Sequence, residues 1–425
     1  MKIINGLKYW GQLLLLPVYW LSFLMPRDKR LWLFGSTFGR RFADNPKYFY
    51  LYVSQHKKKL GVRPVWISHN RKIVRMLNGK GYEAYYYHSI KGIWFALRGK
   101  VYLFDNYVKD INFWQSGGAL KVNMWHGVGN KKINYDNRFD AVRHPKNLWE
   151  RFRYFPRRLS DEKPGHYILA TSPMMCRIFA RAFQVPESHV IEAGYPRNDY
   201  ILGGNIKNIY SSEEKKVLSA ISRWKGQDGI IDLYMPTFRD SETDFFEVMD
   251  LEVFNLFLKE NHILFLTKLH PKSKLAEMFS EITYSNILNI APESDPYVFL
   301  GQADILTTDY SSVYSDFMLL DRPVVAFWYD YGKYSEYTRD GYFDFQEYMP
   351  EIQAITMEEL MDGTKKALME DKAKRKRAVS RKKMFSDTNA DGCEKIAGKL
   401  QEILGMSGQK VLHRNAGEIG NGTYL

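Results

Sequence analysis

The sequence predicts an α/β fold built from two doubly wound domains. From about residue 30 onward, short apolar runs alternate regularly with stretches that suit helices. The runs are apolar throughout, which is typical of parallel strands that helices cover on both faces. A length of 425 residues, of which 45% are hydrophobic, suits two such domains better than one. Ligands of these sheets bind at the carboxyl ends of the strands.

The expected strands fall into two sets along the chain. The first set is RLWLFGS (30–36), PVWISHN (64–70), VYLFDN (101–106) and LKVNMWHG (120–127). The second set is HYILATS (166–172), HVIEAGYP (189–196), IIDLYMPT (230–237), ILFLTKLHP (263–271), ILNIAP (287–292), ADILTTDYSS (303–312) and RPVVAFWYD (322–330). The boundary between the domains is expected between about 150 and 205, and a return of the last helix to the first domain stays open.

The N-terminal stretch 9–26, YWGQLLLLPVYWLSFLMP, is mostly apolar and is flanked by cations. No small-residue cleavage pattern follows it, which weakens a signal peptide. Gln12, Pro17 and a length near the lower limit of about 17 to 25 residues weaken a membrane span. The aromatic residues and flanking cations favour a helix that lies on an anionic membrane surface. A span and a helix that covers the core of the first domain remain the alternatives.

The composition restricts the partners and cofactors. A net charge of +13 favours an anionic partner, namely a nucleic acid, an acidic membrane or a phosphorylated substrate. The basic run 372–384 is either a solvated helix face or a surface for anionic lipid or polymer, and no nucleic-acid motif supports nucleic acid. Cys176 and Cys393 lie far apart, which indicates no disulfide framework and favours a reducing cytoplasm. The acidic stretch DSETD (240–244) is expected to be solvated, so no metal site and no required cofactor are predicted.

Two common catalytic motifs are absent from the sequence. No GxGxxG follows the first expected strand, which disfavours NAD chemistry. No GxSxG is present either, which disfavours an esterase of the α/β-hydrolase type.

Polar residues stand where five of the apolar runs end. These exits are WHG at His126, GYPRND at 194–199, PTFRD at 236–240, KLHP at 268–271 and TDYSS at 308–312. Because the carboxyl ends of strands from two sheets can face one cleft, we expect the five exits to form one active site.

The residue types at these exits suit phosphate chemistry. Asp309, Ser311 and Ser312 precede a helix-like stretch, where hydroxyls and unpaired backbone N–H groups bind phosphate well. Lys268 and Arg239 add charge-assisted hydrogen bonds to phosphoryl oxygens.

Two histidines on opposite domains are expected to divide the catalytic work. His126 titrates near neutral pH in its unperturbed form and can remove a proton from an attacking hydroxyl. His270 is followed by a proline that fixes its direction, and it is expected to stabilise charge on the phosphate under attack.

Taken together and in order, these motifs resemble the CDP-glycerol glycerophosphotransferase family of teichoic acid primases and polymerases. The resemblance runs from about 30 to about 402 and rests on WHG with the following KKI, GYPRND, PTFRD, KLHP, TDYSSVYSDFMLLDRPVVAFWYD, GYFDF and the closing DGCEKIAGKL. It implies a GT-B architecture, two Rossmann-type domains facing a central cleft. His126 would match the general base and His270 the histidine at the donor phosphates. Candidate donor-binding residues are Tyr195, Pro236, Arg239, Lys268, Thr308, Asp309, Ser311, Ser312 and, in the YFDF element, Asp344.

The resemblance also implies substrates, partners and a division of the chain. The donor would be CDP-glycerol or CDP-ribitol, and the acceptor a lipid-linked saccharide or a polyol-phosphate polymer of a teichoic acid or capsule. The enzyme would be peripheral on the cytoplasmic side of the cell membrane. The expected parts are a membrane-associating segment (1–29), an acceptor-side domain (30–190), a CDP-donor domain (191–403) and a flexible tail (404–425).

Departures from the family and two other functions stay open. WHG continues here as GVGNKKI, where many members carry a Thr-Pro-Leu type continuation, so the acceptor side may differ. No long N-terminal extension like that of the large polymerases is present, which favours a primase-like enzyme without excluding a polymerase. A GT-B transferase or epimerase of UDP or GDP sugars is one alternative. A non-catalytic membrane protein that binds acidic polymer is the other.

Overall fold

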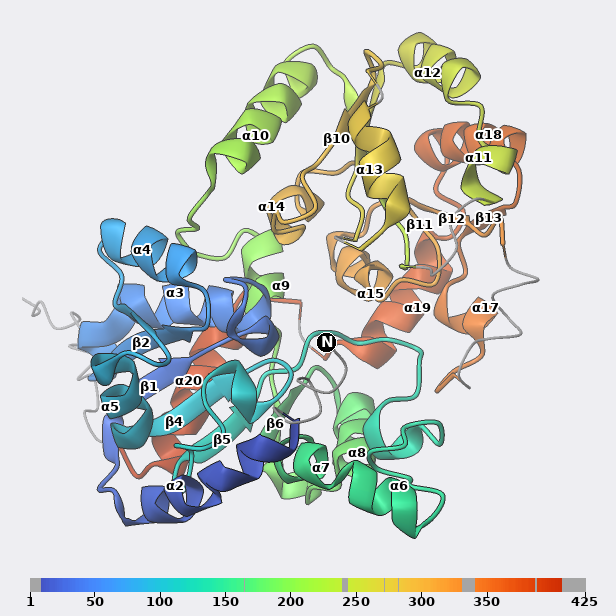
Figure 1. The fold of residues 1–425 in the computed structure, drawn as a ribbon. Coiled ribbons are helices and arrows are strands. Elements are labelled where there is room, and N and C mark those ends of the chain that lie inside the picture. Colours follow the sequence, from blue (N-terminus) through green and yellow to red (C-terminus); the bar gives the residue numbers. More distant parts are fainter. Residues whose placement is uncertain are drawn as a thin grey trace, which may run out of the picture.

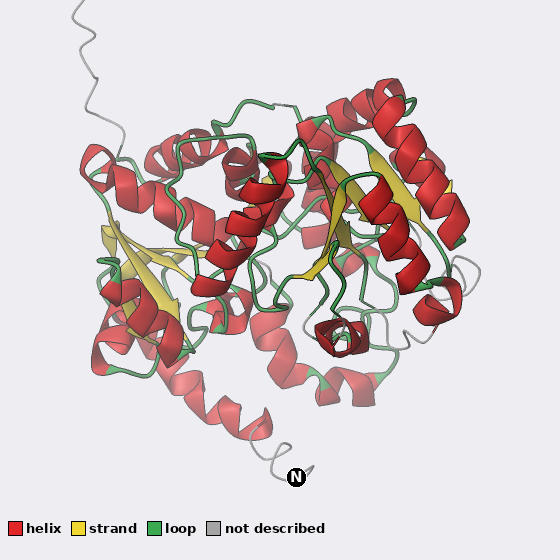
Figure 2. Cartoon of the chain, turned by 90° about the horizontal axis from the view of Figure 1, so that it is seen from above, coloured by secondary structure: helices red, strands yellow, loops and turns green. Residues whose placement is uncertain are grey.

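The chain forms two parallel sheets that helices cover (Figures 1 and 2). The structure is a computed structural model and describes residues 9–163, 165–238, 244–270, 272–281, 283–330, 341–386 and 388–406. The prediction of an α/β fold with two doubly wound sheets is confirmed, because every strand pairing within each sheet is parallel.

The first sheet has seven strands in the order β3-β2-β1-β4-β5-β6-β7. Its strands are β1 Asp28–Phe34, β2 Arg63–Ser68, β3 Ala84–Tyr86, β4 Gly99–Phe104, β5 Leu120–Asn123, β6 Tyr167–Ala170 and β7 Val190–Glu192. The order reverses between β1 and β4, so a crevice opens at the carboxyl ends of these central strands.

The second sheet has six strands in the order β10-β9-β8-β11-β12-β13. Its strands are β8 Ile230–Met235, β9 Ile263–Thr267, β10 Ile287–Asn289, β11 Ile305–Thr308, β12 Val324–Phe327 and β13 Ile352–Ala354. The reversal here lies between β8 and β11, which repeats the plan of the first sheet.

Two details differ from the sequence prediction. HYILATS and HVIEAGYP, placed at the start of the second set, form β6 and β7 of the first sheet, because β6 pairs with β5 and β7 pairs with β6. The strands β3 and β13 were not expected; each has three residues and lies at a sheet edge, too short to show a hydrophobic period.

The helices connect the strands and cover the sheets. The α-helices are α2 Leu16–Leu21, α3 Asp44–Leu60, α4 Arg71–Gly79, α5 Ile90–Arg98, α6 Leu148–Arg153, α7 Phe155–Asp161, α8 Pro173–Phe183, α9 Pro196–Ile201, α10 Ser212–Lys225, α11 Asp244–Val248, α12 Leu251–Glu260, α13 Lys274–Glu281, α14 Tyr297–Leu300, α15 Val313–Phe317, α17 Phe345–Tyr348, α18 Met357–Met369, α19 Lys374–Met384 and α20 Gly392–Ile403. The 3₁₀ helices are η1 Gln12–Leu15, η2 Ser22–Leu24, η3 Thr37–Gly39, η4 Val108–Asp110, η5 Asn134–Asp136, η6 Glu187–His189 and η7 Met318–Leu320.

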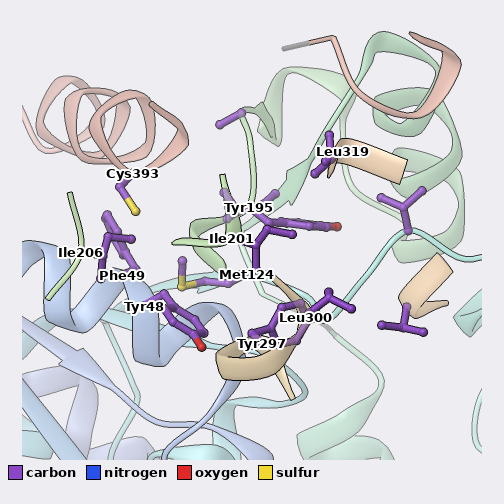
Figure 3. Packing of buried hydrophobic residues seen from close by; sticks show 14 of the residues in the cluster. Tyr48, Phe49, Met124, Tyr195, Ile201, Ile206, Tyr297, Leu300, Leu319 and Cys393 are labelled. Atoms are coloured by element: carbon purple, nitrogen blue, oxygen red, sulfur yellow. The ribbon is translucent and has the colours of Figure 1, made fainter. Parts of the chain in front are cut away.

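One buried core joins the two halves of the molecule. Tyr48 of α3 and Met124, just after β5, share a cluster of buried side chains with Tyr297 and Leu300 of α14 (Figure 3). The helix α20 contacts α3 and α9 and lies beside the first sheet (Figure 1), which is the return of the last helix to the first domain that the sequence left open. The domains are therefore packed together around a shared core.

The N-terminal stretch is broken into short helices that are anchored to the first domain. The Arg27 guanidinium donates hydrogen bonds to the carbonyls of Ala96, Gly99 and Gln115. The Tyr19 ring stacks on Phe113 with ring centroids 4.9 Å apart. Among the described residues, no helix combines the length and hydropathy that crossing a membrane requires.

Candidate active site

A cavity of about 460 Å³ lies where the carboxyl ends of the two sheets face each other. It is lined by residues that follow β5, β8, β9 and β11, and six predicted site residues are among them: His126, Pro236, Lys268, His270, Ser311 and Ser312. The structure brings these six residues, from four of the five predicted strand exits, together at one cavity. Their individual roles stay predictions.

The hydrogen bond of His126 fixes which ring nitrogen can act. Its Nδ1 lies 3.2 Å from the carbonyl oxygen of Asp105, and since a carbonyl only accepts, Nδ1 carries the proton. In the neutral ring Nε2 is then the proton acceptor. The Trp125 ring lies 4.0 Å from the imidazole, and His126 is exposed to the cavity. Nε2 is therefore the ring nitrogen of neutral His126 that can accept a proton.

His270 has the opposite arrangement. Its Nδ1 lies 3.2 Å from the backbone nitrogen of Lys272, and since an N–H only donates, Nδ1 accepts this hydrogen bond. The neutral ring then carries its proton on Nε2 and can donate to an oxyanion. The Phe238 ring packs 5.0 Å from the imidazole. The two histidines thus present an acceptor and a donor to one cavity.

The turn that carries His126 is held by the start of α3. Asn45 is fully buried, and its Nδ2 donates to the carbonyl oxygens of Met124 at 3.2 Å and Trp125 at 2.9 Å. Gly127 has a φ of 146°, which a glycine adopts readily. Trp125 has a φ of 50°, which is unfavourable for a residue with a side chain and persists only where surrounding contacts enforce it. Asn45 supplies such contacts.

Arg197, in the first turn of α9, joins the His126 turn to both domains. Its Nη1 donates to the His126 carbonyl at 2.9 Å and to Asp44 Oδ1 at 2.8 Å. Its Nη2 donates to Asp316 Oδ2 in α15 at 2.6 Å. The guanidinium is 2% exposed and lies 4.6 Å from the centre of the Tyr297 ring. Arg197 therefore links the His126 turn to the helix that follows Ser311 and Ser312.

Asn130 makes a second link across the cavity. Its Nδ2 donates to the Phe343 carbonyl at 3.0 Å, and its Oδ1 accepts from the Phe343 N–H at 2.7 Å. The Tyr342 N–H donates to the Asn130 carbonyl at 2.8 Å, and Tyr342 itself lines the cavity. The loop after WHG is thereby fixed to the YFDF element of the second domain.

Two cations of the cavity come from opposite domains. Lys268 is 7% exposed, and burial together with the nearby Arg41 lowers its pKa to about 8. Its Nζ donates to the Pro292 carbonyl at 2.9 Å. Arg41 donates to the Glu293 carbonyl at 2.9 Å and lines the same cavity. An anionic ligand would therefore be met by charge from both sides.

Asp309 and Thr308 lie beneath the cavity and support its wall. The Asp309 carboxylate accepts from the Thr237 N–H and hydroxyl, both at 2.8 Å. The Thr308 hydroxyl donates to the Met235 carbonyl at 2.7 Å. Both residues are buried and fix the loop that carries Pro236.

Two further predicted residues, Tyr195 and Asp344, are not part of the cavity lining. Tyr195 is fully buried and packs among Met124, Ile201 and their neighbours (Figure 3). Asp344 is exposed and accepts from the Glu347 N–H at 3.1 Å, which caps α17. Arg239 lies outside the described residues, as do 240–243 of the acidic stretch and 407–425 of the expected tail.

Among the residues that the structure describes, no group of three His, Cys, Asp or Glu side chains is arranged to hold a metal ion. The arrangement instead offers a base, a proton donor, hydroxyls and cations. These groups suit a displacement at a phosphoryl group.

Sequence reasoning missed Asn45, Asn130, Arg41 and Arg197. Arg197 belongs to the GYPRND motif, in which only Tyr195 is a predicted site residue. The usable signal was an arginine in the first turn of a helix, where a cation is unfavourable unless an anion compensates it. No comparable local signal exists for Asn45 or Asn130, whose partners lie 79 and 213 residues away in the sequence.

Comparisons with known proteins agree with this geometry. The family described as CDP-Glycerol:Poly(glycerophosphate) glycerophosphotransferase matches residues 18–401. A teichoic acid poly(glycerol phosphate) polymerase of Bacillus spizizenii is 27% identical over 368 residues, which are 83% of this chain and 88% of that protein. A teichoic acid glycerol-phosphate transferase of Staphylococcus aureus is 26% identical over 347 residues, 76% of this chain and 80% of that protein.

Solved structures show the same fold. The wall teichoic acid polymerase TagF superposes with a TM-score of 0.70 at 20% identity, over 95% of this chain and 98% of that chain. A UDP-N-acetylglucosamine 2-epimerase structure from Listeria monocytogenes, described as putative, has a TM-score of 0.53 at 11% identity, over 89% of this chain and 98% of that chain. The fold is therefore GT-B-like, and the family match confirms the resemblance seen in the motifs: the chain belongs to the CDP-glycerol:poly(glycerophosphate) glycerophosphotransferase family.

Proposed function

We propose that the chain transfers glycerol phosphate from CDP-glycerol to a hydroxyl of a lipid-linked saccharide or a polyol-phosphate polymer, and releases CMP. Membership in the family supports the donor and the class of reaction. The observation that carries the proposal is the single cavity into which His126 comes from one sheet and His270 from the other.

The reaction is a displacement at the phosphorus that carries glycerol. The acceptor oxygen attacks this phosphorus while its proton passes to Nε2 of His126. The bond from this phosphorus to the bridging oxygen breaks, and the electron pair leaves with CMP. His270 donates its Nε2 proton as a hydrogen bond to a phosphoryl oxygen, which stabilises the charge that develops there.

The cavity walls suit the diphosphate of the donor. Ser312 is the N-cap residue of α15, and its hydroxyl makes no capping hydrogen bond to that helix. Ser311, Ser312 and Lys268 all line the cavity and can bind phosphoryl oxygens. Arg239 remains a predicted member of this set.

Association with the cytoplasmic face of a membrane is part of the proposal. The N-terminal helices expose Leu14, Leu21 and Leu24, and the neighbouring α6 exposes Leu148 and Trp149. The two parts are in contact, because the Trp10 ring stacks on Phe152 of α6 at 4.7 Å. Exposed apolar side chains on two contacting elements of a basic protein support binding at a lipid surface. Replacing Leu21 and Leu148 with glutamate should abolish sedimentation with phosphatidylglycerol vesicles, and unchanged sedimentation would contradict this assignment.

A comparison of donors tests the reaction. The purified protein should release CMP from CDP-glycerol only when a polyol-phosphate or lipid-linked acceptor is present. CDP-ribitol and UDP-N-acetylglucosamine serve as parallel donors. Preferential CMP release from CDP-ribitol would identify ribitol phosphate as the transferred group. Acceptor-dependent UDP release would instead assign a sugar transferase of the same fold. No release from any donor would favour a non-catalytic polymer-binding protein.

A further inference from the structure

A second cavity of about 350 Å³ lies on the far side of the first sheet from the candidate active site. Its lining includes Lys100 at the start of β4 and Lys121 at the start of β5. All strands of this sheet are parallel, so the amino ends of β4 and β5 lie at the edge opposite to His126, which follows the carboxyl end of β5. The volume is at the lower end of the range of about 300 to 1,000 Å³ that is typical of ligand pockets.

The charge in this cavity is positive and uncompensated. Lys100, Lys121, Lys163 and His166 all line it, and none of the three lysines has a carboxylate at ion-pair distance within the described part of the chain. Burial and the neighbouring cations Arg27 and Lys163 lower the pKa of Lys121 to about 8. Burial, Lys121 and Lys100 lower the pKa of His166 to about 4. An anion bound here would relieve repulsion among these groups.

The other walls of the cavity are apolar and come from the segment with the exposed apolar face. Tyr19 and Phe23 of the N-terminal helices line one side, and Phe113 and Leu159 line another. The Lys121 ammonium lies 5.6 Å from the centre of the Tyr19 ring. On the same N-terminal helices, Trp20 and Leu24 are exposed by 65% and 80%. A molecule with a phosphate and an apolar tail would match both the cations and this wall.

We propose that this cavity binds the phosphate head group of an anionic membrane phospholipid. The phosphate contacts Lys121, Lys163 and Lys100, and the glycerol and upper acyl carbons lie along Tyr19 and Phe23. The site is separate from the reaction cavity and orients the protein on its membrane. This inference rests on the proposed membrane association in one respect: the membrane is the source of the phospholipid.

The first experiment uses a soluble lipid, so that no membrane is needed. Dihexanoyl phosphatidylglycerol, below its micelle concentration, is titrated calorimetrically into the full chain. The variant Lys121→Met with Lys163→Met should bind about tenfold more weakly or worse. The control Lys376→Met with Lys382→Met removes the same charge from exposed positions of α19 and should bind like the wild type. Equal weakening in both variants, or equally tight binding of inorganic phosphate, would overturn the proposal.

The second experiment uses vesicles of phosphatidylcholine with and without phosphatidylglycerol. The cavity variant should lose the preference for phosphatidylglycerol, whereas turnover with a soluble acceptor should stay at the wild-type level and show that the variant is folded. Vesicle binding reduced no more than in the α19 control would refute the cavity as the lipid site and leave membrane association intact. Binding of the soluble lipid without any binding to vesicles would support the cavity as a lipid site but refute its role in orienting the protein on a membrane.

Discussion

Replacement of Arg197 by methionine tests whether the arrangement of the domains positions the base. Methionine keeps much of the apolar stem but removes the guanidinium, which donates to the His126 carbonyl, Asp44 and Asp316. Since these three acceptors come from the His126 turn, α3 and α15, one substitution releases three elements together.

The expected cost in stability follows from the burial of the partners. Asp316 is fully buried and Asp44 is partly exposed, so mainly Asp316 is left as an uncompensated buried charge. Breaking a buried pair by removing one partner costs about 3–5 kcal/mol. Burial already raises the pKa of Asp316, and without Arg197 the carboxyl will take up a proton, so we expect the lower end, about 3 kcal/mol. Adding Asp316→Asn should recover part of this loss.

The effect on catalysis should fall on kcat. Without Arg197 the His126 carbonyl loses the Nη1 hydrogen bond, and a base displaced by about 1 Å can lose about a hundredfold in rate. The KM for CDP-glycerol should change little, because Arg197 does not line the cavity. Arg197→Lys keeps the charge but not the forked geometry, so it should restore stability more than kcat.

Urea unfolding and steady-state CMP release measure the two effects. Lys216→Met is the matched control, since its ion pair with Glu213 is exposed and should be worth about 0–1 kcal/mol. A folded Arg197→Met protein with wild-type kcat would refute the role in positioning His126. A stability loss no larger than that of the control would refute the account of the buried charge.

Three further predictions concern the base, the cavity lysine and a buried carboxyl. His126→Gln should lower kcat by about 10²–10⁴-fold with a similar donor KM in CMP-release kinetics, and an unchanged kcat would remove His126 as the base. The donor kcat/KM should fall as the pH rises through about 8, where Lys268 loses its proton, and Lys268→Arg should abolish this fall; the same limb in that variant would assign it to another group. Burial raises the pKa of Asp232 from 3.8 to about 7, so the folded state binds more protons than the unfolded state between these values and its stability falls as the pH rises. Asp232→Asn should therefore be more stable than the wild type in urea at about pH 8 but not at about pH 4, and equal stability at both would contradict the raised pKa.

The central strands could be predicted because each of them is a run of consecutive apolar residues. In β9, Ile263–Thr267, all five residues are buried, as expected for a parallel strand between two helical layers. By contrast, β3 and β13 are three-residue edge strands, and they form because a neighbouring strand offers a pairing edge. The paired residues Trp66 and Ala84 are 18 positions apart, and Val325 and Ile352 are 27 positions apart. A local hydrophobic pattern therefore does not predict these two strands.

The site was predictable to the extent that strand exits determine it. His126 and His270 follow apolar strands directly, and the rule that ligands bind at carboxyl ends places both at a cleft. What the rule does not contain is the ring nitrogen that each histidine presents. That depends on the Asp105 carbonyl for His126 and on the Lys272 N–H for His270, which are features of the folded backbone.

The hydrogen bonds that position the His126 turn and the loop after it connect the two domains. Arg197 joins the His126 turn to α15, and Asn130 joins the next part of the same loop to Phe343. A rotation of one sheet relative to the other would break these hydrogen bonds and change the direction of the base at the same time. The position of His126 is therefore coupled to the arrangement of the two domains, so neither domain alone carries the geometry that the transfer requires.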